Sequence, residues 1–138
     1  MAKVNRYLKD KDMDLIDHAL GRPADPMAET YRNYFAIGTA SNIAGQFRES
    51  PNWIEGRNMG DMAYFFVTPI GRAALLHYLK SIGDKHRYFT VTYKGEALSP
   101  IIATSHSKAK YAKWLDFNDL CDIPFGEFCK MATVRIAS

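Results

Sequence analysis

The hydrophobic pattern changes its period at Thr68, which places a strand directly before a helix. Met62 to Val67 are mostly apolar and aromatic, as is typical of a strand. Thr68 is a residue type that caps helices, and Pro69 suits a first helical turn. The following apolar residues, up to Ile82, recur at helical spacing. A chain with this junction contains both element types, and we predict an α+β fold.

A β-hairpin is predicted immediately before the junction. Two short runs, residues 53–57 and 62–67, flank the sequence NMGD, and the chain is expected to turn near Gly60. Arg57 and Asn58 would then project from the hairpin tip, where they can reach a phosphate or a protein partner. An ordinary exposed turn would look the same.

Three helices are predicted ahead of the hairpin. Residues 12–20 and 27–37 both show helical spacing of apolar side chains. Ser41 or Asn42 can cap a third, short helix that ends at residue 47 or 48. The first part of the chain, residues 1–83, is therefore expected to be mainly helical with one hairpin.

The remaining residues, 84–138, predict a ββαβ part that packs with the first as a single domain. RYFTVTY and LSPIIAT indicate two strands around a turn at Lys94–Gly95, and Pro100 indicates that the second strand starts late or lies at an edge. Ser105 or Ser107 caps the following helix. DFNDL and PFGEF suggest short turns or a broken helix, and MATVRIA a final strand.

Composition narrows the functional classes. The 138 residues suit one ordinary domain or two very small modules that share a core, and 47% hydrophobic residues are typical of a globular chain. No apolar run approaches the roughly 20 residues that span a bilayer, and the N-terminus does not resemble a secretory signal. With only Cys121 and Cys129, we expect reduced thiols, a cytoplasmic location and no membrane association.

Basic residues are concentrated in residues 80–113. This segment holds seven lysines and arginines against two acidic residues, a balance of +5, and Arg87 is one of its basic residues. A basic segment can attract nucleic acid or an acidic protein surface.

The helix that begins near Ser105 carries the densest part of this charge. A helical wheel places Tyr111 and Leu115 toward the core, and Lys110 and Lys113 on the opposite face with Trp114 at its edge. Two lysines and a tryptophan can contact phosphate and stack on a base. A solvated helix with one half-buried tryptophan has the same pattern, and the sequence favours that simpler interpretation.

Catalytic chemistry has little support. The four histidines are scattered, and no phosphate-binding glycine motif occurs. Cys121 and Cys129 stand among apolar residues and are expected to be buried and inert. The acidic residues Asp116, Asp119 and Asp122 are more simply turn and cap residues. We therefore expect no enzyme activity, no metal and no cofactor.

The aromatic sequence YFFV raises a separate question. Neighbouring side chains of a strand point to opposite faces, so a hairpin cannot bury all of these rings on one side. Either both faces of the hairpin are covered, or one row of rings is exposed as a contact surface. Aromatic residues are common anchors in protein interfaces.

Two resemblances to known proteins add to this interpretation of the sequence. YFFVTPIGRAALLHYL, within residues 41–82, resembles the wing-to-helix junction of bacterial winged-helix proteins. Most of the chain, including VTYKGE and IIATSHSKAKYAKWLDFNDLCDIPFGEFCKMATVRIA, is similar to small accessory proteins of bacteriophages and prophages.

The second resemblance implies a phage or prophage origin, and it makes an inhibitor of a host defence system, such as an anti-CRISPR protein, the leading candidate. Such a protein would occupy a host protein, a ribonucleoprotein complex or a nucleic-acid-binding surface. The first implies the alternative, a winged-helix-like DNA-binding regulatory or accessory protein. A DNA mimic is disfavoured because the net charge is +3.

Overall fold

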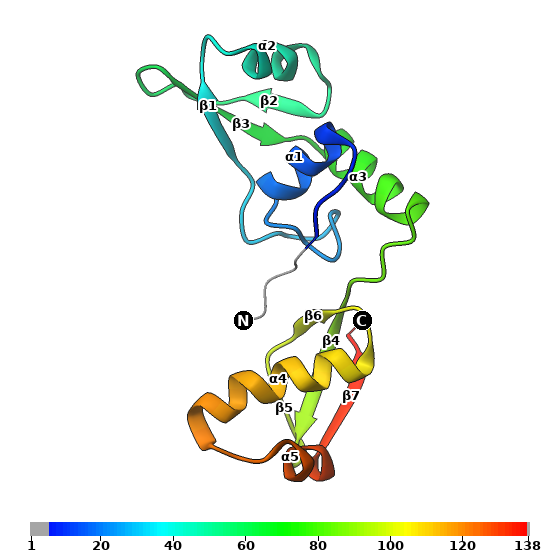
Figure 1. Ribbon diagram of the computed structural model, residues 1–138. Helices are drawn as coiled ribbons and strands as arrows, with labels where there is room; N and C mark the ends of the chain where they lie inside the picture. The colour runs from blue at the N-terminus through cyan, green and yellow to red at the C-terminus, as the bar shows by residue number, and fades with distance from the viewer. Residues whose placement is uncertain (1–5, 138) are drawn as a thin grey trace. The chain divides into compact units, whose positions relative to one another are not determined.

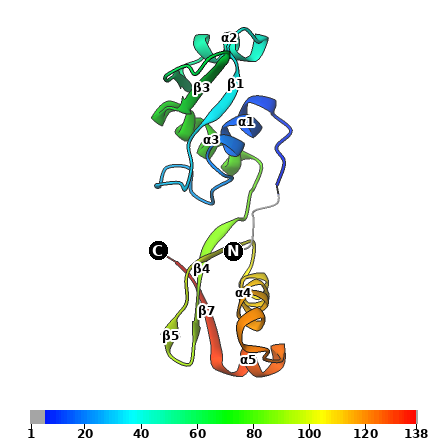
Figure 2. The same cartoon turned by 90° about the vertical axis from the view of Figure 1, so that its left-hand side faces the viewer.

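The computed structural model describes residues 6–137, and the chain divides into two compact units. The N-terminal unit is Arg6–Asp84, and residues 85–137 belong to the C-terminal unit. Each unit combines helices with an antiparallel sheet, which confirms the α+β prediction (Figures 1 and 2). The division falls within one residue of the predicted border at 83/84. That the two parts form a single domain stays a prediction.

The N-terminal unit contains three helices and a three-stranded sheet in the order β1-β3-β2. Its elements are α1 (Lys11–Ala19), β1 (Phe35–Gly38), α2 (Asn42–Glu49), β2 (Trp53–Glu55), β3 (Met62–Val67) and α3 (Pro69–Ser81). The predicted caps are confirmed, because the side chains of Ser41 and Thr68 accept hydrogen bonds from the backbone N–H groups of Ala44 and Gly71. The predicted hairpin is also confirmed, as β2 and β3 pair antiparallel.

The helix predicted over residues 27–37 is wrong. Phe35–Gly38 is a strand that pairs antiparallel with β3, and no helix forms before it in that range. Asn33 fixes the entry to this strand, because its side chain both accepts from the Val67 N–H at 2.7 Å and donates to the Val67 carbonyl at 3.1 Å. Only α2 therefore lies between β1 and β2, and the predicted succession of three helices before the hairpin does not form.

Aromatic rings fill the core of this unit on one face of the sheet. Phe47 of α2 stacks on Trp53 of β2 with ring centroids 4.0 Å apart. The buried ring of Phe65 in β3 meets Phe47 edge-on, and Leu75 of α3 and Ile16 of α1 belong to the same cluster. The core thus joins all three helices to the inner face of the sheet.

Buried ion pairs hold the two ends of this unit together. Asp17, which is fully buried, accepts hydrogen bonds from the guanidinium groups of Arg6 and Arg22. Arg6 also donates to Asp84 at 3.1 Å, and Arg22 donates to Asp14 at 2.8 Å. The first and last residues of the unit are therefore linked through one charged network.

The C-terminal unit is built around β4, which pairs with three other strands. Its elements are β4 (Arg87–Tyr93), β5 (Glu96–Ala97), β6 (Ile101–Ala103), α4 (His106–Cys121), α5 (Phe125–Met131) and β7 (Ala132–Ile136). The predicted ββαβ order is confirmed in outline, with β5 and α5 added. Lys94 and Gly95, both with positive φ, make the tight turn between β4 and β5.

Two details of this unit differ from or refine the prediction. The sequence DFNDL is not a turn, since it continues α4 to Cys121, whereas PFGEF begins α5. The second strand does start late, because β6 begins directly after Pro100.

Candidate binding surface

The six predicted binding residues fall into different units. Arg57 and Asn58 belong to the N-terminal unit, and the others to the C-terminal unit: Arg87, Lys110, Lys113 and Trp114.

The predicted orientation of helix α4 is wrong. Tyr111, expected in the core, is 50% exposed, and Leu115 is also exposed. Lys113, expected in solvent, is only 8% exposed, and the helix buries this side together with Ala109. The small side chain of Ala109 allows a close approach to the sheet, and the long stem of Lys113 fills the space beside it.

Lys113 is engaged in a structural contact. Its Nζ atom donates a hydrogen bond to Ser99 Oγ at 2.7 Å. A buried lysine with this partner cannot share an exposed basic face with Lys110, which is half-buried. The expected pair of solvent-exposed lysines is thus not formed.

Trp114 also has structural partners. Its indole N–H donates to the Ile123 carbonyl at 2.7 Å, and its ring lies 5.3 Å from Phe125 and 5.5 Å from Tyr111. These contacts tie α4 to the start of α5. Arg87 is exposed at the start of β4, where its Nη1 donates to the His86 carbonyl.

In the hairpin loop, Arg57 and Asn58 are both exposed but differ in their contacts. Near the loop, the carboxylate of Glu55 is paired with Arg48 at 3.0 Å. The hydrogen bond and the charge of Arg48, with a smaller effect from Asn58, lower the pKa of Glu55 below its ordinary value. Arg57, in contrast, borders a hollow on the outer face of the sheet.

The outer sheet face is the side of β1, β2 and β3 opposite the aromatic core. Along β3, Ala63, Phe65 and Val67 are buried, while Tyr64 and Phe66 point the other way. Phe66 is 40% exposed and Tyr34, which precedes β1, is 44% exposed. Of the two alternatives for YFFV, the exposed row of rings is the one that forms.

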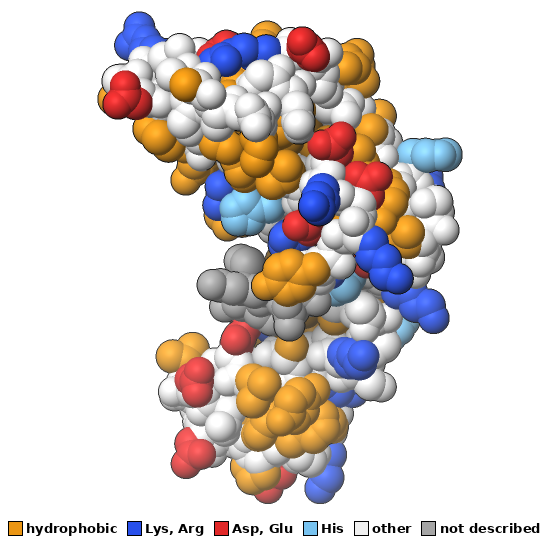
Figure 3. Space-filling view, turned by 45° about the horizontal axis from the view of Figure 1, so that its top comes forward, with side chains coloured by type: hydrophobic (Ala, Val, Ile, Leu, Met, Phe, Trp, Pro, Cys, Tyr) orange, Lys and Arg blue, Asp and Glu red, His pale blue; other side chains and the backbone are white. Residues whose placement is uncertain are grey.

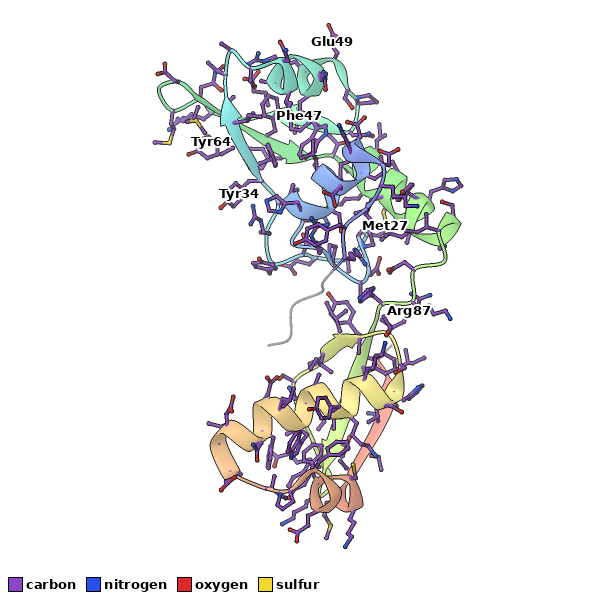
Figure 4. The ribbon with its side chains drawn as sticks, in the orientation of Figure 1. Met27, Tyr34, Phe47, Glu49, Tyr64 and Arg87 are labelled. Carbon is purple, nitrogen blue, oxygen red and sulfur yellow. The ribbon has the colours of Figure 1, made fainter. Side chains whose placement is uncertain are left out.

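Strand register orders these side chains into rows. Phe66 is the partner of Ile54 on β2, and continuing the β1–β3 register by one residue places Tyr34 on its other side. In the next row Tyr64 pairs with Ala36. Figure 4 shows Tyr34 and Tyr64 on one side of these strands, and Phe47 between α2 and the sheet.

The small residues between these rings leave an open hollow. Its volume is about 600 Å³, and it is lined by Asn33, Tyr34, Ala36, Arg57, Met59, Tyr64 and Phe66. Among these lining residues Arg57 alone carries a charge. Because Asn33 is satisfied by the backbone of Val67, the rings, the methionine and the arginine remain to contact a ligand.

Two further residues set the positions of the rings. A Cβ atom at Gly56 would come within 2.3 Å of Cε2 of Phe66, so the ring occupies the space beside this glycine. The guanidinium carbon of Arg32 lies 4.4 Å from the centroid of the Tyr34 ring. A second cation therefore lies next to the rings.

A second hydrophobic surface lies on the C-terminal unit (Figure 3). It includes the exposed side chains of Tyr111 and Leu115, which lie four residues apart on one side of α4. Nothing in its outline or charge indicates a particular ligand.

The thiols differ from expectation. Cys121 is exposed at the end of α4 and Cys129 is half-buried, so the predicted burial of both is wrong. Cys121 is the last residue of α4, and its side chain is exposed. Within residues 6–137, no three histidine, cysteine or acidic side chains lie close enough to hold a metal ion. None of the helices in that range combines the length and apolar character needed to cross a bilayer.

The sequence contained a signal for part of this surface. The period of two in YFFV predicts one row of rings on each face, and Arg57 was singled out at the hairpin tip. Tyr34 and Ala36 were missed because they were assigned to a helix. The large side chains of Phe35 and Ile37 alternate with the small side chain of Ala36, and this period of two could have identified the strand.

Comparison with protein-family models, with curated protein sequences and with solved structures found no match to this chain.

Proposed function

We propose that this chain is a small phage- or prophage-encoded binding protein without catalytic activity. It acts in the host cytoplasm as an inhibitor of a defence system of the anti-CRISPR kind, by occupying a host macromolecule with its outer sheet face. The sequence resemblance to accessory phage proteins supports the biological setting.

The observation that carries the binding role is the exposed row formed by Tyr34, Phe66 and Ile54. One face of the sheet is packed against three helices, and this opposite face presents rings and aliphatic groups around an open hollow. A large continuous apolar patch on a protein surface often marks a binding site.

The alternative, duplex DNA binding by a winged helix, has weaker support. A helix-turn-helix reads the major groove with its second helix. Here α2 alone separates β1 from β2, so the hairpin has no such helix pair before it.

Two isoleucines with the same exposure allow a controlled test. Ile54 on the outer sheet face and Ile70 at the start of α3 are each 60% exposed. We would express the chain in bacteria whose CRISPR system eliminates a target plasmid, and measure how many cells retain that plasmid. The wild type and Ile70→Ser should protect the plasmid, and Ile54→Ser should not.

Equal protection by both variants would contradict the use of this face. The wild type would also be tested in a set of strains that together carry each type of CRISPR system. If it protects the plasmid in none of these strains, the inhibitor role is contradicted. Circular dichroism of both purified variants would establish that they are folded.

A further inference from the structure

We propose that the outer sheet face binds single-stranded nucleic acid, with bases on the rings of Tyr34, Tyr64 and Phe66 and a phosphate at Arg57. This inference rests on the proposed function, because it names the ligand of the same face.

The spacing of the rings fits unstacked bases. Tyr64 and Phe66 are two residues apart on β3, which is roughly 6.8 Å along a strand. Successive phosphates along one strand of duplex DNA advance by only about 3.4 Å. Two bases held on these rings would thus be drawn apart from each other, a geometry available to a single strand and not to an intact duplex.

Charge around the rings also favours this ligand. Arg57, the only charged residue among those lining the hollow, is a cation, and Arg32 lies against Tyr34. Both oxygens of the nearby Glu55 carboxylate accept hydrogen bonds from Arg48. A polyanion therefore meets a cation and aromatic rings without an acidic residue lining the hollow.

Small residues give the bases room. Ala36 lies across from Tyr64 on β1, and the N–H of Gly56 donates to the Tyr64 carbonyl at 2.8 Å on the other side. A longer side chain at position 36 would fill the space beside the Tyr64 ring. The space beside Gly56 is instead occupied by Phe66, so glycine at position 56 permits this ring its present position.

The direct test is fluorescence anisotropy of the purified full chain with labelled oligouridine and oligodeoxythymidine of about 12 nucleotides, a length within the range that one OB-fold occupies. The wild type should bind at least one of them. Phe66→Ala should weaken binding by roughly 5- to 150-fold, the value of one stacked base. Ile70→Ser should bind as the wild type does.

Two further variants separate base stacking from phosphate contact. Arg57→Ala should reduce the slope of log affinity against log salt by about 0.7, the value for one phosphate contact of a single strand. Gly56→Ala, which displaces the Phe66 ring without deleting it, should weaken binding while the circular dichroism spectrum is retained.

Absence of binding to both oligonucleotides, or unchanged affinity in Phe66→Ala and Gly56→Ala, would overturn this inference. Loss of binding in Lys110→Ala but not in Phe66→Ala would also overturn it, because that result assigns binding to the C-terminal unit. If Ile54→Ser abolishes plasmid protection while the oligonucleotides do not bind, the proposed function stands and only the ligand is wrong.

Discussion

Asp17 is the residue on which the charged network of the N-terminal unit depends. It is fully buried and is shared by Arg6 and Arg22. Removing one partner of a buried ion pair leaves the other charge uncompensated, so Asp17→Ala should lower the free energy of unfolding by about 3–5 kcal/mol. Urea unfolding followed by tryptophan fluorescence measures the change, since Trp53 reports on this unit.

The matched control is Glu49→Ala at the exposed end of α2 (Figure 4). Its unfolding free energy should stay within about 0.5 kcal/mol of the wild-type value. Equal stability of Asp17→Ala and Glu49→Ala would show that the network contributes nothing to folding.

Asp14 gives the N-terminal unit a stability that depends on pH. Burial alone would raise the pKa of this carboxyl, but hydrogen bonds from Arg22 and the Leu8 N–H, with the charge of Arg22, lower it below its ordinary 3.8. A carboxyl whose pKa is lower in the folded state stabilises the fold above its unfolded pKa. That stability is lost as the pH falls through the folded pKa.

Comparison of the wild type with Asp14→Asn tests this dependence. The difference in unfolding free energy should be constant from neutral pH down to the ordinary pKa of 3.8 and should shrink below it. A difference that is independent of pH across the acid range would mean that the Asp14 charge does not stabilise the fold.

At the scale of elements, α4 shows how tertiary contacts can reverse a sequence pattern. Lys113 contributes its stem to the core and its ammonium group to Ser99. Lys113→Ala should destabilise the protein by about 1–3 kcal/mol, through lost packing and one lost hydrogen bond. Lys110→Ala should change the unfolding free energy by no more than about 0.5 kcal/mol. Thermal unfolding of both variants measures the contrast, and a larger loss for Lys110→Ala would contradict the orientation of α4.

Local and distant interactions explain which elements could be predicted from the sequence and which could not. Helices with a clear cap, such as α2 after Ser41 and α3 after Thr68, were located from sequence because the cap is a local interaction. The buried face of α4 was missed because alanines, rings and lysine stems occur around its circumference, so no side is clearly the most apolar. Strand β1 was missed because it is held by distant residues, notably through Asn33 and Val67.

At the scale of the whole molecule, the sequence predicts two candidate binding regions, helix α4 and the hairpin, which belong to different units. The structure favours only one of them as a binding surface. In the basic segment, residues 80–113, the side chain of Lys113 is buried in the C-terminal unit. The hairpin keeps Arg57 at the border of a hollow lined by aromatic rings. The outer sheet face therefore replaces α4 as the candidate for binding, and the charge of the segment 80–113 is left without an assigned ligand.

The most direct measurement of this claim is a two-dimensional amide NMR titration of the full chain with the single-stranded oligonucleotide. We predict that amide shifts change at residues 34–36, 54–57 and 62–66, and that the amides of α4 are unaffected. Shift changes confined to residues 106–121, with none on the outer sheet face, would contradict the account.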